Sequence, residues 1–103
     1  SLSIDAAALD RPTVNIVFDG RVKLPYAKSA RRMNEYDFYQ EVLNTGGSRK
    51  VESRDELKQA LIDYLNDPTA DAKKRGTLRA RFCGVFDGKT GRRFAEMIIG
   101  YLG

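Results

Sequence analysis

Two serines and an aspartate stand at the start of the chain, in the segment Ser1-Leu-Ser3-Ile-Asp5, ahead of three alanines. The free N–H groups of a helix's first turn attract phosphate, and serine hydroxyls add further donors. A carboxylate one turn further along can accept hydrogen bonds from both hydroxyls of a ribose. The segment therefore predicts a site for an anionic ligand. Two alternatives stay open, because serine is also a common helix cap and an acid in the first turn also stabilises the helix dipole.

A second group of candidate residues is basic and lies in the long connection over residues 19–34. Long loops in compact domains are often functional. Basic side chains there could meet phosphates or an anionic lipid surface, although solvated charges on a crossover are the simpler interpretation. The five basic residues are Arg21, Lys23, Lys28, Arg31 and Arg32.

Aromatic residues near these basic side chains raise the question of base stacking, as in a nucleic-acid binder. Tyr26, Tyr36, Phe38 and Tyr39 have this arrangement. Packing of a short helix explains them better, and no recognised nucleic-acid motif is present. We therefore expect no nucleic-acid partner.

The composition excludes several kinds of chemistry. The chain of 103 residues has no histidine and one cysteine, Cys83, so it cannot form a Cys/His zinc site or a Ser–His or Cys–His dyad by itself. A single cysteine forms no internal disulfide, which fits a reducing compartment. The net charge of +4 is a mild bias, and no apolar stretch approaches the roughly eighteen residues of a membrane span. We expect no metal, no cofactor and a cytoplasmic location, with peripheral contact to the inner face of the membrane as an option.

The hydrophobic pattern predicts the order helix, strand, helix, strand and then three helices. The first helix covers residues 1–9 and ends near Arg11-Pro12, because the residue before a proline avoids the helical region. Residues 13–18 are β-branched and almost continuously apolar, which is typical of a parallel strand covered on both faces. Asp19 and Gly20 are expected to close this strand as a turn. The next helix and strand are expected at 35–43 and 48–52, with Asn44-Thr-Gly46-Gly47 as the stop of the helix.

The second half of the chain reads as helical. Ser53 and Glu56 form a capping box that opens the clearest amphipathic helix, which ends before Pro68. A following helix begins at Pro68 or Thr69 and runs to about Cys83, and Asp87 is expected to cap the last helix. The inward positions expected in the helix that ends at Cys83 are Ala72, Leu78 and Phe82.

Three motifs, taken in order, resemble the C-terminal nucleotide-binding half of GT-B glycosyltransferases, closest to enzymes of the CDP-glycerol glycerophosphotransferase type. The resemblance covers nearly the whole chain. The motifs are the opening Ser1-Leu-Ser-Ile-Asp-Ala-Ala-Ala-Leu-Asp-Arg-Pro12-Thr-Val-Asn-Ile16, the strand and helix start Val51-Glu-Ser-Arg-Asp-Glu-Leu57 followed by Asn66-Asp-Pro68, and the tail Phe86-Asp-Gly-Lys-Thr-Gly-Arg-Arg-Phe94.

The resemblance implies an α/β fold: a partial Rossmann-like domain with two or more parallel strands and about five helices. Residues 1–103 would form one domain, the C-terminal portion of a nucleotide-donor-binding domain. The implied reaction transfers a sugar or glycerol phosphate from a CDP- or UDP-linked donor in cell-envelope polysaccharide or teichoic-acid-type synthesis, without a metal. Ser1 and Ser3 would bind the donor's diphosphate and Asp5 its ribose.

No catalytic residue is assigned in this chain, because the family's catalytic histidines and base belong to parts that precede these motifs. We therefore expect the 103 residues alone to be inactive, as a piece of a longer transferase. The implied partners are the nucleotide-activated donor and a lipid-linked acceptor at the membrane surface. A homodimer through an unpaired strand edge at 13–18 is a further option. The alternative function is a non-catalytic interaction domain that docks a protein partner or an anionic membrane surface.

Overall fold

The computed structural model of the protein describes residues 2–103, so Ser1 lies outside the described residues. This part of the chain holds six α-helices, one short 3-10 helix and two strands. In chain order they are α1 (Leu2–Ala8), β1 (Val14–Ile16), η1 (Tyr26–Lys28), α2 (Ala30–Asn34), α3 (Asp37–Asn44), β2 (Arg49–Val51), α4 (Arg54–Asn66), α5 (Ala72–Cys83) and α6 (Thr90–Leu102).

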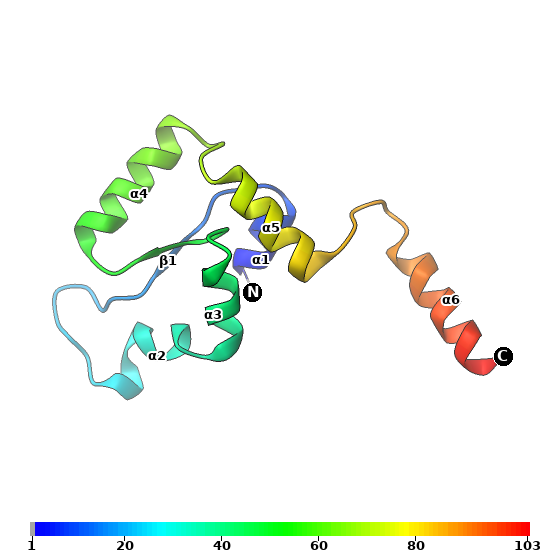
Figure 1. The fold of residues 1–103 in the computed structure, drawn as a ribbon. Coiled ribbons are helices and arrows are strands. Elements are labelled where there is room, and N and C mark those ends of the chain that lie inside the picture. Colours follow the sequence, from blue (N-terminus) through cyan, green and yellow to red (C-terminus); the bar gives the residue numbers. More distant parts are fainter. Residues whose placement is uncertain (1) are drawn as a thin grey trace.

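The two strands pair in parallel, with Val14 opposite Arg49 and Ile16 opposite Val51. The connection between them passes through η1, α2 and α3, as a parallel pair requires a long crossover. Helices α1 and α5 pack against each other, and α4 packs against both strands (Figure 1). The predicted α/β class is confirmed, and the arrangement is consistent with part of a Rossmann-like domain.

The core is small and joins three helices. Ala7 of α1, Val42 of α3 and Leu78 of α5 are fully buried together, and Ile4 and Phe82 pack at their edge. The short alanine side chain lets α1 approach α5 closely. The inward position predicted for Leu78 is confirmed.

A close approach of α5 to the turn before β2 explains the glycine pair that follows α3. Gly46 has a φ of +72°, which favours glycine and ends α3 in the way the sequence predicted. A Cβ atom on Gly47 would stand 2.6 Å from Cβ of Leu78 and 2.9 Å from the carbonyl oxygen of Lys74. Glycine at this position therefore sets the distance between β2 and α5.

The predicted long connection over residues 19–34 is partly helical, because it contains η1 and α2. Helix α2 has only five residues and no amphipathic repeat, so periodicity could not reveal it. Its first turn depends on Ser29, whose Oγ accepts a hydrogen bond from the Arg31 N–H. A single side-chain cap thus decides the local structure.

The serine cap predicted for α4 is confirmed, and Glu56 reaches back as expected, although to the residue before the cap rather than to Ser53 itself. Ser53 Oγ accepts from the N–H of Glu56 at 3.1 Å, and the Glu56 carboxylate accepts from the N–H of Glu52 at 2.6 Å. The boundaries of the next two helices differ from the prediction. Helix α5 begins at Ala72, after Asp71 adopts a left-handed φ of 60°. Helix α6 begins at Thr90 with Lys89 as its cap residue, although the Asp87 carboxylate does accept from the Lys89 N–H.

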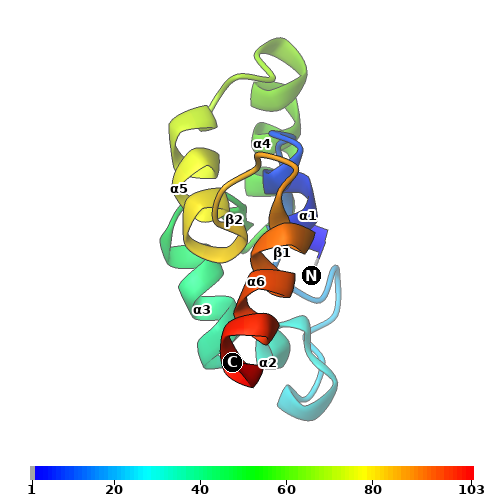
Figure 2. The same ribbon diagram turned by 90° about the vertical axis from the view of Figure 1, so that its right-hand side faces the viewer.

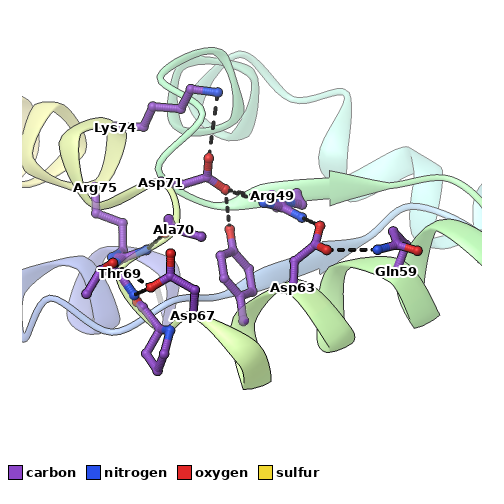
Figure 3. A network of polar contacts seen from close by, with 11 residues as sticks. Arg49, Gln59, Asp63, Asp67, Thr69, Ala70, Asp71, Lys74 and Arg75 are labelled. Atoms are coloured by element: carbon purple, nitrogen blue, oxygen red, sulfur yellow. Dashed lines mark hydrogen bonds and ion pairs between the residues drawn. The ribbon is translucent and has the colours of Figure 1, made fainter.

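A polar network centred on Arg49 fixes β2 to the helices beside it (Figure 3). The Arg49 guanidinium donates to Asp63 at 2.6 Å and to Asp71 at 2.7 Å, and it lies 4.5 Å from the centre of the Tyr64 ring. Hydrogen bonds from Gln59 and Arg49 hold the pKa of Asp63 below its usual value. At Asp71, burial alone would raise the pKa, but hydrogen bonds from Arg49 and Tyr64 outweigh it and the pKa is lowered. The network is a structural clamp.

Helix α6 stands apart from the rest of the chain (Figure 1), and in the turned view of Figure 2 it lies in front of the other elements. All thirteen of its residues are exposed, including large apolar side chains such as Phe94 and Ile98. The radius of gyration of 17.2 Å reflects this extension, since a compact domain of this size has about 13 Å. No helix in residues 2–103 combines the length and apolarity needed to cross a bilayer.

Candidate functional site

A hollow of about 440 Å³ lies where β1 and β2 end. Its wall begins with Val17, Phe18 and Asp19, which directly follow β1, and continues with Lys50 and Glu52 at the end of β2. In open α/β sheets, ligands bind at the carboxyl ends of the strands, and small-molecule sites have volumes of roughly 300–1,000 Å³. Position and size both make this hollow, which we call the strand-end pocket, the candidate site.

Four basic side chains line the strand-end pocket. Arg21 and Lys23 come from the loop after β1, Arg31 from α2 and Lys50 from β2. Lys50 pairs with Glu52 at 2.9 Å, whereas Arg21 and Lys23 form no ion pair within residues 2–103. Cations without acidic partners at the mouth of a pocket attract anions.

Asp19 also lines the pocket, but its carboxylate is occupied by the chain itself. It accepts from the Ser29 hydroxyl at 2.7 Å, from the N–H of Ala30 at 2.8 Å and from the N–H of Leu24 at 3.3 Å. The hydrogen bonds from Ser29 and Ala30 hold the pKa of Asp19 below its usual value. Asp19 therefore stays ionised and closes the loop between β1 and α2.

Neutral and acidic groups complete the wall of the strand-end pocket. Asn34 and Gln40 supply amide groups whose nitrogens already donate to the carbonyl oxygens of Ala30 and Asn34, at 2.8 and 2.6 Å, so their amide oxygens are the groups left for a ligand hydroxyl. Glu35 supplies a carboxylate that already accepts a hydrogen bond from the Tyr26 hydroxyl at 2.5 Å. That bond raises the pKa of Tyr26. The pocket thus combines cations for an anionic group with amides and carboxylates able to bind hydroxyls.

The structure places the predicted residues Ser3 and Asp5 on α1, outside the lining of the strand-end pocket. Ser3 is buried, and its hydroxyl can donate to Asn15 Oδ1 at 3.2 Å or to Ser48 Oγ at 3.3 Å. Asp5 is exposed. The third predicted residue, Ser1, lies outside the described residues. Ser3 therefore ties α1 to the sheet in this structure, and ligand binding at Ser3 and Asp5 stays a prediction.

The five basic residues of the predicted long loop separate into two groups. Arg21, Lys23 and Arg31 line the strand-end pocket, whereas Lys28 and Arg32 line a second, larger and more open hollow of about 740 Å³. Of the aromatic residues nearby, Phe38 contacts the Tyr39 ring edge-on, with ring centres 5.5 Å apart. Phe38 also packs edge-on against Phe82 of α5, with ring centres 5.7 Å apart.

Other chemistry finds less support in the described part of the chain. Residues 2–103 contain no group of three or more His, Cys, Asp or Glu side chains placed to hold a metal ion. Cys83 is partly exposed at the end of α5. The strand-end pocket is thus the best-formed candidate site.

Sequence reasoning missed Asp19, Lys50 and Glu52. Asp19 was interpreted only as part of a turn with Gly20, although an aspartate that opens a long loop after a strand is a signal for a side-chain-capped turn. Lys50 and Glu52 reach the pocket because β2 pairs in parallel with β1 in one particular register. Spacing along the chain does not encode that register.

Comparison with known proteins adds the decisive observation. The family model of CDP-glycerol:poly(glycerophosphate) glycerophosphotransferases matches residues 1–100. The chain belongs to this glycerophosphotransferase family. The resemblance predicted from the motifs is therefore confirmed. Searches among curated proteins and among solved structures give no match.

Membership in the glycerophosphotransferase family supports a function of that type in the synthesis of a cell-envelope polymer. The family also implies a nucleotide-linked donor.

Proposed function

We propose that the strand-end pocket binds the diphosphate of the nucleotide-linked donor in a glycerophosphotransferase. The observation that carries the proposal is the convergence of Arg21, Lys23, Arg31 and Lys50 on one hollow at the ends of β1 and β2. Guanidinium and ammonium groups form charge-assisted hydrogen bonds with phosphate oxygens. They also stabilise charge that develops on a leaving diphosphate, which lets the chain contribute to transfer without supplying a catalytic base.

The rest of the pocket suits the uncharged parts of such a donor. Asn34 and Gln40 offer amides, and Glu52 offers a carboxylate oxygen when Lys50 turns toward phosphate. Carboxylates accept hydrogen bonds from ribose or glycerol hydroxyls. We propose CDP-glycerol as the donor on the basis of the family, with a UDP-linked donor as the competing candidate.

The roles predicted for Ser1, Ser3 and Asp5 stay part of the proposal as a second place of contact with the donor. Under this version, Ser1 and Ser3 bind diphosphate and Asp5 binds ribose. Ligand binding by Ser3 would require its hydroxyl to leave Asn15 and Ser48. The variants Ser3→Ala and Asp5→Asn separate the two places, because they weaken donor binding only if α1 takes part.

Isothermal titration with CDP-glycerol, CDP and UDP tests the proposed function. We expect the double variant Arg21→Ala/Lys23→Ala to bind CDP about 10–100-fold more weakly, since two charge-assisted contacts are lost. The double variant Arg54→Ala/Lys58→Ala removes the same charge from exposed positions of α4 and serves as the control. Equal affinity of the two double variants would contradict the assignment of the pocket.

The alternative function, docking of a protein partner or an anionic membrane surface, is favoured by one observation. Helix α6 exposes Phe94, Ile98 and Leu102 along one side, with basic residues Arg92 and Arg93 in its first turn. Amphipathic helices of this kind bind partners or lie on membranes. Sedimentation with anionic vesicles, and light scattering to detect a homodimer, would favour this alternative if CDP and UDP do not bind.

A lipid-linked acceptor and a peripheral position at the inner face of the membrane follow from the same proposal. The open hollow beside Lys28 and Arg32 is a candidate contact surface, because it combines these cations with the apolar side chains of Leu24 and Met33. The variant Lys28→Ala/Arg32→Ala would lower association with anionic vesicles while leaving CDP affinity unchanged.

A further inference from the structure

One carboxylate, that of Asp19, joins the two ends of the loop between β1 and α2. Asp19 stands at the first end of the loop and accepts hydrogen bonds from Ser29 and Ala30 at the other end, at 2.7 and 2.8 Å. A third bond, from the Leu24 N–H at 3.3 Å, reaches into the middle of the loop. Surface loops with ends held together in this way are compact and often functional. Arg21 and Lys23 lie between Asp19 and Leu24 in the chain. The hydrogen bonds at the two ends and in the middle of the loop therefore limit the positions of both side chains.

Ser29 passes the same constraint on to a third cation. Its side chain is buried, and its Oγ accepts from the Nε–H of Arg31 at 3.1 Å while donating to Asp19. A hydroxyl oxygen that donates in a fixed direction presents its lone pairs in fixed directions too. The Arg31 guanidinium is therefore held on the pocket wall through Ser29 by Asp19.

We infer that Asp19 and Ser29 are positioning residues for anion binding: the pair closes the loop over residues 19–30 and holds Arg21, Lys23 and Arg31 in place around the strand-end pocket. This inference rests on the proposed function, because it presumes that the pocket takes a diphosphate. The loop is otherwise exposed from Gly20 to Lys28. Without the hydrogen bonds of Asp19, its basic side chains would therefore sample many positions. Holding charged groups in their binding geometry lowers the entropic cost of association.

The charge of Asp19 makes the inference sharply testable. A carboxylate on the wall of an anion pocket repels the ligand, so its neutralisation strengthens binding if the charge is all that matters. A positioning role predicts instead that neutralisation of Asp19 weakens ligand binding. In Asp19→Asn, the amide nitrogen faces the N–H of Leu24 or Ala30 and cannot accept a hydrogen bond from it. At least one tie of the loop is then lost.

Glu52→Gln is the matched control, since Glu52 lines the same pocket and its side chain makes no hydrogen bond to the loop within residues 2–103. Ser29→Ala is the second test variant, because it removes the link to Arg31 without changing any charge. Binding of inorganic pyrophosphate and of CDP by the whole protein is measured by calorimetry. Hydrogen exchange of the Leu24 and Ala30 amides, and the Nε–H resonance of Arg31, report the loop directly.

We expect Asp19→Asn and Ser29→Ala to weaken pyrophosphate binding about tenfold, the size of one lost hydrogen bond to a charged group. Exchange at Leu24 or at Ala30 accelerates in Asp19→Asn, whichever amide the Asn nitrogen faces, and the Arg31 Nε–H signal loses protection in Ser29→Ala. Glu52→Gln binds pyrophosphate more tightly, because this ligand has no hydroxyls for the Glu52 carboxylate to bind. If Asp19→Asn instead binds more tightly, as Glu52→Gln does, Asp19 acts only as a charge and the inference is overturned. Absence of binding by the unmodified protein contradicts the proposed function itself, which is a separate outcome.

Discussion

Arg75 on α5 donates from Nε to a carboxylate oxygen of Asp10 at 3.1 Å, although the two residues lie 65 positions apart. Its side chain is 1% exposed, and it also donates to the carbonyls of Ala70 and Pro68. One buried guanidinium therefore joins the end of α1 to the turn between α4 and α5. Asp10 itself has a left-handed φ of 53°, so the backbone turn after α1 and the ion pair occur together.

We expect Arg75→Met to lower the free energy of unfolding by about 2–4 kcal/mol, because it leaves two carbonyls and a carboxylate without their donor. Asp10→Asn should cost no more than about 1 kcal/mol, since the Asp10 side chain is 57% exposed and water replaces the lost contact. Urea unfolding followed by circular dichroism measures both. Similar losses in the two variants would show that the ion pair, rather than the carbonyl contacts, carries the stability.

Gly47→Ala should lower the free energy of unfolding although it adds only one methyl group. The added Cβ atom would stand 2.6 Å from Cβ of Leu78 and 2.9 Å from the Lys74 carbonyl oxygen, so α5 must shift. Overpacking of this kind costs about 1–3 kcal/mol. Gly76→Ala, within α5, is the control, because the nearest neighbour of the added Cβ atom would be Arg79 Nη2 at 3.9 Å. We expect it to stabilise the protein by about 0.5–1 kcal/mol, and a loss there comparable with Gly47→Ala would contradict the packing described.

The sequence predicted what local patterns control. The capping box of Ser53 and Glu56, the stop at Gly46 and the parallel pairing suggested by residues 13–18 all depend on neighbours in the chain or on plain apolarity. The family resemblance rested on such local motifs as well. The buried position of Arg75 was missed because its partner Asp10 lies 65 positions away in the chain. The basic segment Ala-Lys-Lys-Arg around it is typical of an exposed helix face.

The candidate site shows the same division more strongly. Arg21, Lys23 and Arg31 were recognised as basic, but only the fold separates them from Lys28 and Arg32 and brings them together with Lys50. The serines at the start of the chain have suitable chemistry, yet the position of Ser3 is decided by Asn15 and Ser48, which belong to the sheet. Long-range pairing thus determines which polar residues share a pocket.

Stability should fall at alkaline pH because of Tyr64. Burial, with a further contribution from the hydrogen bond to Asp71, raises the pKa of Tyr64 from 10.0 to about 12. Below pH 10.0 the phenol is neutral in both states, and above it only the unfolded chain releases the proton until about pH 12, so stability is lost across this window. Urea unfolding at a series of pH values should show a smaller loss in Tyr64→Phe. Tyr101→Phe, at a position 92% exposed, should behave like the unmodified protein. If the free energy of unfolding depends on pH equally in all three proteins, the raised pKa of Tyr64 is contradicted.

Truncations in α6 should leave the core untouched. Phe94 is 59% exposed, so Phe94→Ala is expected to change the free energy of unfolding by no more than about 0.5 kcal/mol. Val42 is fully buried beside Ala7 and Leu78, and Val42→Ala should cost about 1–3 kcal/mol. Chemical denaturation measures the two. A large loss in Phe94→Ala would mean that α6 packs on the body of the chain in solution.

The central claim is that the strand-end pocket binds the diphosphate of a nucleotide-linked donor. The most direct measurement is an NMR titration of the isotope-labelled protein with CDP-glycerol, with backbone amides and arginine Nε–H groups followed together. The account predicts saturable shifts at Arg21, Lys23, Arg31 and Lys50, with inorganic pyrophosphate competing at the same residues. Saturable shifts confined to residues 3–5, or no shifts with any nucleotide, would contradict it.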